Sequence, residues 1–244
     1  MGWLTEWRRR RVLARHRIDD ALWQAASAPL KFLPRAPKLR ELALLFLAEK
    51  EFTGAHQLPV TDVMRVSIAA QACTPILELG LDWYRGWRGI VVYPGDFRVR
   101  RAEVDEDGVV HEWEDDLAGE AMPGGPVVLS WDAAAHDPAI NVVIHEFAHK
   151  LDMLNGEADG VPPLHAGMDR REWRAAFAEA YDGFCDAVDR GRDTWLDPYA
   201  AEHPSEFFAV ISEAFFREPH ETKRRYPDVY EQLALFYRQN PAGS

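Results

Sequence analysis

The chain has 244 residues, of which 47% are hydrophobic and 28% charged, and its formal net charge at pH 7 is −12. A chain of this length can bury a full hydrophobic core, so we expect a single soluble domain over residues 1–244. The acidic balance argues against direct nucleic-acid binding, because contacts to phosphates require clustered Lys and Arg. It does not exclude a protein partner.

The two cysteines, Cys73 and Cys185, are too few for a disulfide framework, and neither belongs to a Cys-x-x-Cys zinc site. This usage favours the reducing cytoplasm. The longest apolar run, residues 42–48, is too short for a membrane span and is flanked by Glu41 and Glu49. We therefore expect a cytoplasmic protein without a membrane span.

The N-terminal segment has an unusual composition. Trp3, Leu4 and Trp7 precede four consecutive arginines at positions 8–11, without the apolar core or the cleavage site of a signal peptide. We interpret residues 1–15 as a solvated helix end or a mobile tail. The alternative is a segment that touches an anionic membrane surface or a partner.

Residues 16–80 are predicted to form a helical N-terminal part. Apolar residues recur at helical spacing in residues 18–27 and 39–52, and the three prolines of residues 29–37 form a connector between them. A third helix follows, which Thr61 or Asp62 can cap and Pro75 ends.

The middle of the chain changes to strand-forming sequence. Residues 90–93 are β-branched and apolar, and residues 99–104 can pair with 109–113 across a turn at Asp107-Gly108. Residues 127–131 read as a further strand. This strand either borders a cleft and pairs with an extended substrate or is an ordinary interior strand. We expect a small, largely antiparallel sheet and an α+β fold that is mostly helical.

The pattern His-Glu-x-x-His at residues 145–149 carries the clearest chemistry. Its helix is predicted to begin at Asp137 as the N-cap, with Pro138 next, and to end at Asn155-Gly156. His145 and His149 are four residues apart and share one helix face, so both can bind one metal ion. Glu146 then lies beside a metal-activated water and can act as general base, as in zinc metalloproteases. Further helices are predicted over residues 169–190, 204–216 and 227–238.

A catalytic zinc site needs a third protein ligand and an open position for water. The downstream segment offers Glu202, His203, Glu206 and Glu213. Glu206 and Glu213 are seven residues apart and share a face of an otherwise apolar helix. Periodicity alone does not choose among the four candidates.

These residues carry a resemblance. The run from His145 to Asp152, the Gly-Pro-Val-Val-Leu-Ser-Trp strand before it, and Tyr199 with Ser205-Glu-Phe-Phe-Ala after it resemble the Mlc titration factor A family of zinc metallopeptidases, over about residues 18–240. That family is similar in its active site to the catalytic domain of anthrax lethal factor. There, a Tyr stands seven residues before a ligand Glu, an interval that Tyr199 and Glu206 keep. Ser205 replaces an Ala that is common in the motif.

The resemblance implies a zincin-like fold with one Zn²⁺ bound by His145, His149 and Glu206. It also implies that Glu146 is the general base and that Tyr199 stabilises the transition state. The expected activity is peptide hydrolysis of an aminopeptidase type, on a peptide or protein substrate. From the same family we expect a link to the regulation of sugar uptake.

Two points stay open at the level of sequence. Asp152 lies one turn after His149 and Glu213 two turns after Glu206, so either can orient a ligand from behind. The alternative function is a regulatory protein that sequesters a transcriptional repressor of the Mlc type, with catalysis secondary. An intact Glu146 favours the enzyme, because a structural zinc site needs no general base.

Overall fold

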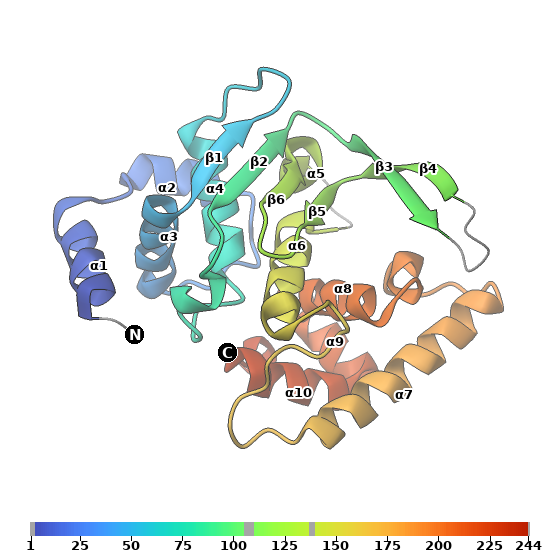
Figure 1. Ribbon diagram of the computed structural model, residues 1–244. Coiled ribbons are helices and arrows are strands. Elements are labelled where there is room, and N and C mark those ends of the chain that lie inside the picture. The colour runs from blue at the N-terminus through green and yellow to red at the C-terminus, as the bar shows by residue number, and fades with distance from the viewer. Residues whose placement is uncertain (1–2, 105–109, 137–139, 244) are drawn as a thin grey trace.

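The computed structural model describes residues 3–104, 110–136 and 140–243, and its N-terminal part is helical (Figure 1). The helices here are α1 (Trp3–Arg15), α2 (Asp20–Ser27), α3 (Pro37–Glu49) and α4 (Asp62–Cys73). The Asp19 carboxylate caps α2 and the Thr61 hydroxyl caps α4, where each accepts hydrogen bonds from backbone N–H groups that have no partner inside the helix. Helices α2, α3 and α4 all lie within residues 16–80, the range predicted to be helical.

Helix α3 ends earlier than the sequence pattern predicted. Residues 51 and 52 belong to strand β1 (Glu51–Gly54), and Glu51 N donates to the carbonyl of Arg88 in the neighbouring chain segment. The apolar spacing continues through Phe52, so periodicity alone does not mark this boundary. Pairing with a distant strand decides it.

The main sheet is mixed rather than largely antiparallel. It has the strand order β1-β2-β6-β5, with β2 (Gly89–Tyr93), β5 (Gly119–Ala121) and β6 (Val127–Ser130). Strand β2 is parallel to both β1 and β6, and only β5 is antiparallel to its neighbour β6. Parallel neighbours require long connections, and α4 lies in the connection between β1 and β2.

Strand β6 is an interior strand of this sheet. It pairs with β2 on one side and β5 on the other, so it cannot accept a substrate at its edge. The interior alternative for residues 127–131 is therefore the correct one, and the chain turns into the short helix α5 (Trp131–His136) directly afterwards. The edge next to the His-Glu-x-x-His helix belongs to β5.

The predicted hairpin is confirmed. Strand β3 (Phe97–Val104) pairs antiparallel with β4 (Val110–Leu117), with Val104 opposite Val110 next to the turn. The hairpin extends away from the four-stranded sheet (Figure 1). The turn at Asp107-Gly108 lies outside the described residues.

The motif helix α6 (Val142–Asp152) is shorter than predicted. Its N-cap is Asn141, whose Oδ1 accepts from the Ile144 N–H at 2.8 Å, so the predicted cap at Asp137 is wrong for this helix. Asp137 and Pro138 themselves lie outside the described residues. Asn is as good a cap as Asp, and only the fold distinguishes the two positions.

The C-terminal half is helical, as predicted, and packs against α6 (Figure 1). Its elements are the 3₁₀ turns η2 (Met153–Asn155), η3 (Pro198–Ala201) and η4 (Pro241–Gly243) and the helices α7 (Arg170–Asp189), α8 (Pro204–Arg217), α9 (Pro219–Arg225) and α10 (Pro227–Tyr237). None of the helices in the described ranges is long and apolar enough to cross a membrane.

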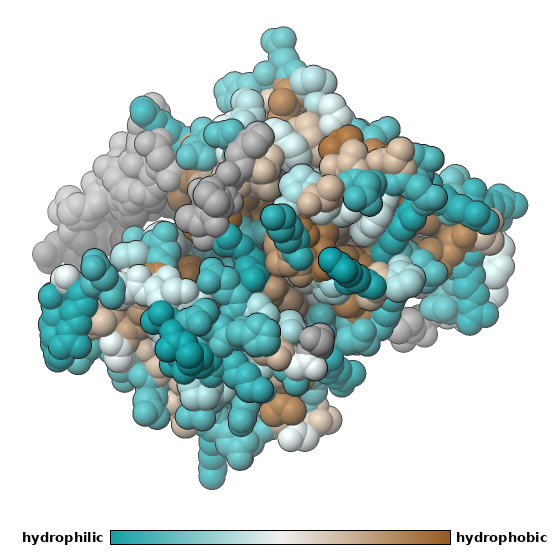
Figure 2. Space-filling view, turned by 180° about the vertical axis from the view of Figure 1, so that it is seen from behind, coloured by the Kyte–Doolittle hydropathy of each residue, from teal (hydrophilic) through white to brown (hydrophobic). Residues whose placement is uncertain are grey.

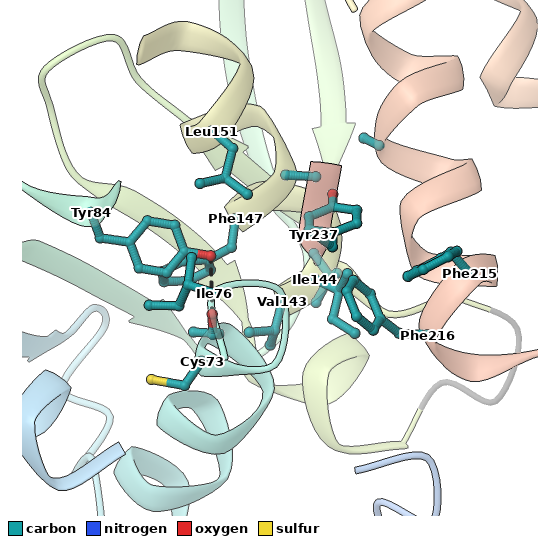
Figure 3. Packing of buried hydrophobic residues seen from close by; sticks show 14 of the residues in the cluster. Cys73, Ile76, Tyr84, Val143, Ile144, Phe147, Leu151, Phe215, Phe216 and Tyr237 are labelled. Atoms are coloured by element: carbon teal, nitrogen blue, oxygen red, sulfur yellow. Dashed lines mark hydrogen bonds between the residues drawn. The ribbon is translucent and has the colours of Figure 1, made fainter. Parts of the chain in front are cut away.

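Helix α6 runs through the middle of the hydrophobic core, where Figure 3 shows its apolar side chains between those of the N-terminal and C-terminal helices. The Phe147 ring lies 5.0 Å from Tyr84 and 5.6 Å from Phe46, measured between ring centroids. Tyr84, from the 3₁₀ turn η1 (Leu81–Tyr84), donates its hydroxyl to the Ala72 carbonyl at 3.0 Å. Truncating a buried Phe of this kind costs about 3–5 kcal/mol, so the core fixes α6 firmly.

Candidate metal centre

Two helices supply the side chains of the candidate metal centre. Helix α6 presents His145 and His149 on one face, and helix α8, which packs against it, presents Glu206 from its first turn. Helix α8 opens with Pro204 in its first turn and His203 as its N-cap. The contacts of Glu206 with both histidines place this first turn beside the middle of α6.

Three atoms converge at this contact. His145 Nε2 lies 3.0 Å from Glu206 Oε2, His149 Nε2 lies 3.2 Å from the same oxygen, and the two Nε2 atoms are 3.1 Å apart. Ligand atoms in tetrahedral coordination at about 2.0–2.1 Å from zinc are about 3.3 Å from one another. The three residues therefore fit a tetrahedral metal ion, and they form a three-residue group that could hold one.

The four candidates for a third ligand have different surroundings. Glu202 and His203 are exposed, and the His203 ring accepts from the Ser205 N–H at 3.2 Å as the helix cap. Glu213 lies behind His145 rather than beside both histidines. Only Glu206 among the four brings a carboxylate oxygen next to both Nε2 atoms. That it binds a metal stays a prediction.

Glu213 contacts the first histidine from behind. Its Oε1 lies 2.8 Å from His145 Nδ1, and its Oε2 accepts from the Asn141 N–H at 2.5 Å. A proton on Nδ1, donated to the carboxylate, leaves Nε2 with a lone pair that faces Glu206. Burial alone would lower the pKa of His145, but the hydrogen bonds with Glu206 and Glu213 raise it well above its ordinary value. Of the two residues considered for this role, Glu213 contacts a histidine.

Asp152 has a different contact. Its Oδ2 accepts from the Gly160 N–H at 2.8 Å, and the Gly160 carbonyl accepts from Trp173 Nε1 at 3.0 Å. Gly160 has a φ of +78°, and a Cβ there would lie 2.8 Å from the Pro204 carbonyl oxygen. Asp152 thus holds the loop after α6 against the start of α8. In the described part of the chain, Asp152 Oδ1 and His149 Nδ1 are buried without a hydrogen-bond partner.

Glu146 is 4% exposed and faces strand β5. Burial raises the pKa of its carboxyl to about 8, with smaller contributions from Glu206, Glu120 and Glu213 and an opposing one from His145. A divalent cation beside it would lower this pKa again. What suits Glu146 to general-base chemistry is therefore its position, next in sequence to His145 and buried against β5.

Tyr199 lies on the open side of the group. It is 41% exposed, in η3, with its ring centroid 6.2 Å from that of His145. The turn is held from α7, where the Tyr181 hydroxyl donates to the Ala201 carbonyl at 2.9 Å. The phenol is therefore close enough to share a substrate with the histidines, and its catalytic role stays a prediction.

Two residues that contribute to the site were not predicted from the sequence. Gly119 in β5 lies so close to Glu146 that a Cβ would be 2.5 Å from its Oε1. Lys150 is buried, and its Nζ donates to the carbonyls of Met122 at 2.5 Å and Gly125 at 2.8 Å, which ties the β5–β6 turn to α6. A lysine inside an apolar helix is a signal that was available from the sequence, whereas the glycine gave none.

The comparisons with known proteins agree with this site. The family model described as glucose-regulated metallo-peptidase M90 matches residues 4–238, and the chain therefore belongs to this family of metallopeptidases. An uncharacterized protein of Synechocystis is 39% identical over 211 residues, which cover 84% of this chain and 76% of the relative. Mlc titration factor A of Yersinia pestis is 36% identical over 214 residues, covering 85% and 79%, and so is that of Yersinia pseudotuberculosis.

The family resemblance expected from the sequence is thus confirmed. A metallopeptidase family and the His145, His149 and Glu206 group together point to a metal ion.

Proposed function

We propose that this protein is a zinc-dependent peptidase. His145, His149 and Glu206 would hold one Zn²⁺, since two imidazoles and a carboxylate with an open fourth position are the donor set of catalytic zinc. The observation that carries the proposal is the buried Glu146, one residue from the first histidine, beside a group of three convergent donors. A purely structural site has no use for such a carboxylate.

A zinc ion in this place supplies a Lewis acid that acidifies water and polarises a carbonyl group. The chain's own residues do the rest. Glu146 takes the proton of the attacking water and passes it to the departing amine. Tyr199 donates a hydrogen bond from its hydroxyl to the oxyanion from the open side of the site. This bond would lower the activation barrier by roughly 3 kcal/mol.

The edge of the sheet supports a peptide as the substrate. Strand β5 ends the four-stranded sheet, and its Gly119 lies against Glu146. An extended peptide that pairs with β5 would bring its backbone carbonyl to the base, which is the strand-addition mode of peptide recognition. We propose an aminopeptidase-like action on short peptides in the cytoplasm, with a link to the regulation of sugar uptake.

The test is hydrolysis of short peptides with free and with acetylated N-termini. Zinc-loaded protein is expected to cleave the free peptides and to lose activity with a chelator, and added zinc should restore it. Equal cleavage of acetylated peptides would refute the aminopeptidase specificity alone. Hydrolysis that resists complete removal of the metal would refute the zinc mechanism.

The name of the Yersinia relatives, Mlc titration factor A, favours a second role. We propose that the chain also binds a transcriptional repressor of the Mlc type. Calorimetry with a purified Mlc repressor tests this role. Micromolar or tighter binding by the Glu146→Ala variant would support a partner function that does not need catalysis, and no binding at such concentrations would contradict it.

A further inference from the structure

Helix α1 presents a surface that neither the fold nor the candidate metal centre uses. It contributes no buried residue to the core. Trp3, Leu4 and Trp7 are 77%, 54% and 51% exposed. They are three of the eight large hydrophobic side chains that are exposed in the described residues, and they lie within five positions of one another. Clustered exposure of this kind marks an interaction site more often than chance.

The helix is docked by its opposite face. The Arg9 side chain is 13% exposed and forms ion pairs with Glu49 and Asp82, each at 2.8 Å. At helical spacing Trp3, Trp7 and Arg11 lie in one row, directed away from Arg9. These ion pairs dock the helix while leaving Trp3 and Trp7 exposed, and α1 lies at the outer edge of the molecule, beyond α3 (Figure 1).

The same outward surface is strongly cationic. Helix α1 contains five arginines and one glutamate, in a chain whose net charge is −12. Arg8, Arg11 and Arg15 form no ion pair within the described part of the chain, and the Arg11 guanidinium lies 5.3 Å from the Trp7 ring centroid. Where α1 meets the rest of the molecule, Arg85 and Arg88 join Trp7, Arg8, Arg11 and Arg15 around a hollow of about 800 Å³. Seen from behind, the surface is mainly hydrophilic, with apolar residues scattered over it (Figure 2).

We propose that helix α1 docks this protein on the surface of an anionic lipid bilayer. Tryptophan is favoured in the headgroup layer, where its ring is buried and its N–H can stay hydrated. Arginines on the same face meet the lipid phosphates, as in helices that lie in the membrane interface. An acidic protein partner would match the arginines but leave the terminal tryptophans unexplained. The metal centre takes no part in this docking, because the helices that carry it, α6 and α8, lie beyond α3 and α4 as seen from α1 (Figure 1).

Vesicle co-sedimentation of the full chain tests the proposal, with phosphatidylglycerol–phosphatidylcholine vesicles against pure phosphatidylcholine. We expect binding to the anionic vesicles only, weakened by salt. Arg11→Ala with Arg15→Ala should lower the partition coefficient roughly 25-fold, at about fivefold per arginine. Trp3→Ser with Trp7→Ser should lower it by about tenfold or more.

Matched controls are available on the other side of the molecule. Leu235→Ser removes an apolar side chain that is about as exposed as Trp7. Arg171→Ala with Arg174→Ala removes two exposed arginines from α7. Neither control should change binding to the vesicles. The proposal is overturned if wild-type protein ignores anionic vesicles at low salt, or if the tryptophan pair has no effect, which would indicate plain charge adsorption. Tight binding of soluble polyglutamate through α1 without vesicle binding would also overturn it, in favour of an acidic protein partner.

Discussion

Gly119→Ala is the most specific perturbation of the proposed general base. The added Cβ would lie 2.5 Å from Glu146 Oε1 and 2.7 Å from Glu146 Cγ, with Val142 Cγ2 at 2.6 Å. Carbon–oxygen contacts below 3.0 Å are essentially never observed, so the carboxylate must move by about 0.5–1 Å, and a displacement of about 1 Å in a reacting group costs about 100-fold in rate. We expect kcat on a cleavable peptide to fall by about this factor.

The assay compares kcat, KM and zinc content of the variant with those of Gly183→Ala, whose Cβ meets nothing within 4 Å. Zinc content should be unchanged in both, because the candidate ligands do not contact Gly119. Crowding Val142 should also lower the free energy of unfolding by about 1–3 kcal/mol, which circular dichroism will show. Wild-type kcat in a folded Gly119→Ala protein would refute the placement of Glu146 against β5.

Three further outcomes are expected. Glu213→Gln weakens the charge behind His145 Nδ1 and should lower zinc affinity by about 10–100-fold in a competition titration, so unchanged affinity would contradict the orienting role. Tyr199→Phe should lower kcat by roughly 100-fold with little change in KM, and an unchanged kcat would leave Tyr199 as a packing residue. Burial lowers the pKa of Lys50 to about 7, so between pH 7 and the unfolded pKa near 10.5 the unfolded chain binds more protons than the folded chain. In thermal melts, the stability of wild type relative to Lys50→Met should therefore rise from pH 7 to 9. A difference that does not change with pH would refute a buried Lys50 with a lowered pKa.

Local sequence chemistry predicted the part of the site that lies on one helix. His145, Glu146 and His149 need only helical spacing to be recognised, and the structure brings the two histidines together as expected. Glu206 could not be identified from spacing alone, because its closeness to His149 depends on the packing of α8 on α6. Four acidic or imidazole residues were chemically acceptable, and only tertiary structure separates them.

The errors in the predicted fold have the same origin, because they also depend on tertiary contacts. Strand direction is not encoded in a strand's own residues, so the parallel pairing of β2 with both neighbours was not predictable from residues 90–93. Two good caps, Asp137 and Asn141, precede α6, and local preference did not choose the second. Gly119 has no chemistry of its own, and its importance comes only from the carboxylate that lies against it.

The zinc content and the peptide turnover of one pair of variants, measured on the same samples, test the proposed mechanism most directly. Glu146→Gln is expected to keep one zinc ion per chain and to lose hydrolysis, whereas Glu206→Gln is expected to lose the metal and the activity together. A zinc-loaded Glu146→Gln protein that hydrolyses peptides at the wild-type rate would contradict the role of the base. A Glu206→Gln protein that binds zinc as tightly as wild type would contradict the metal centre between α6 and α8.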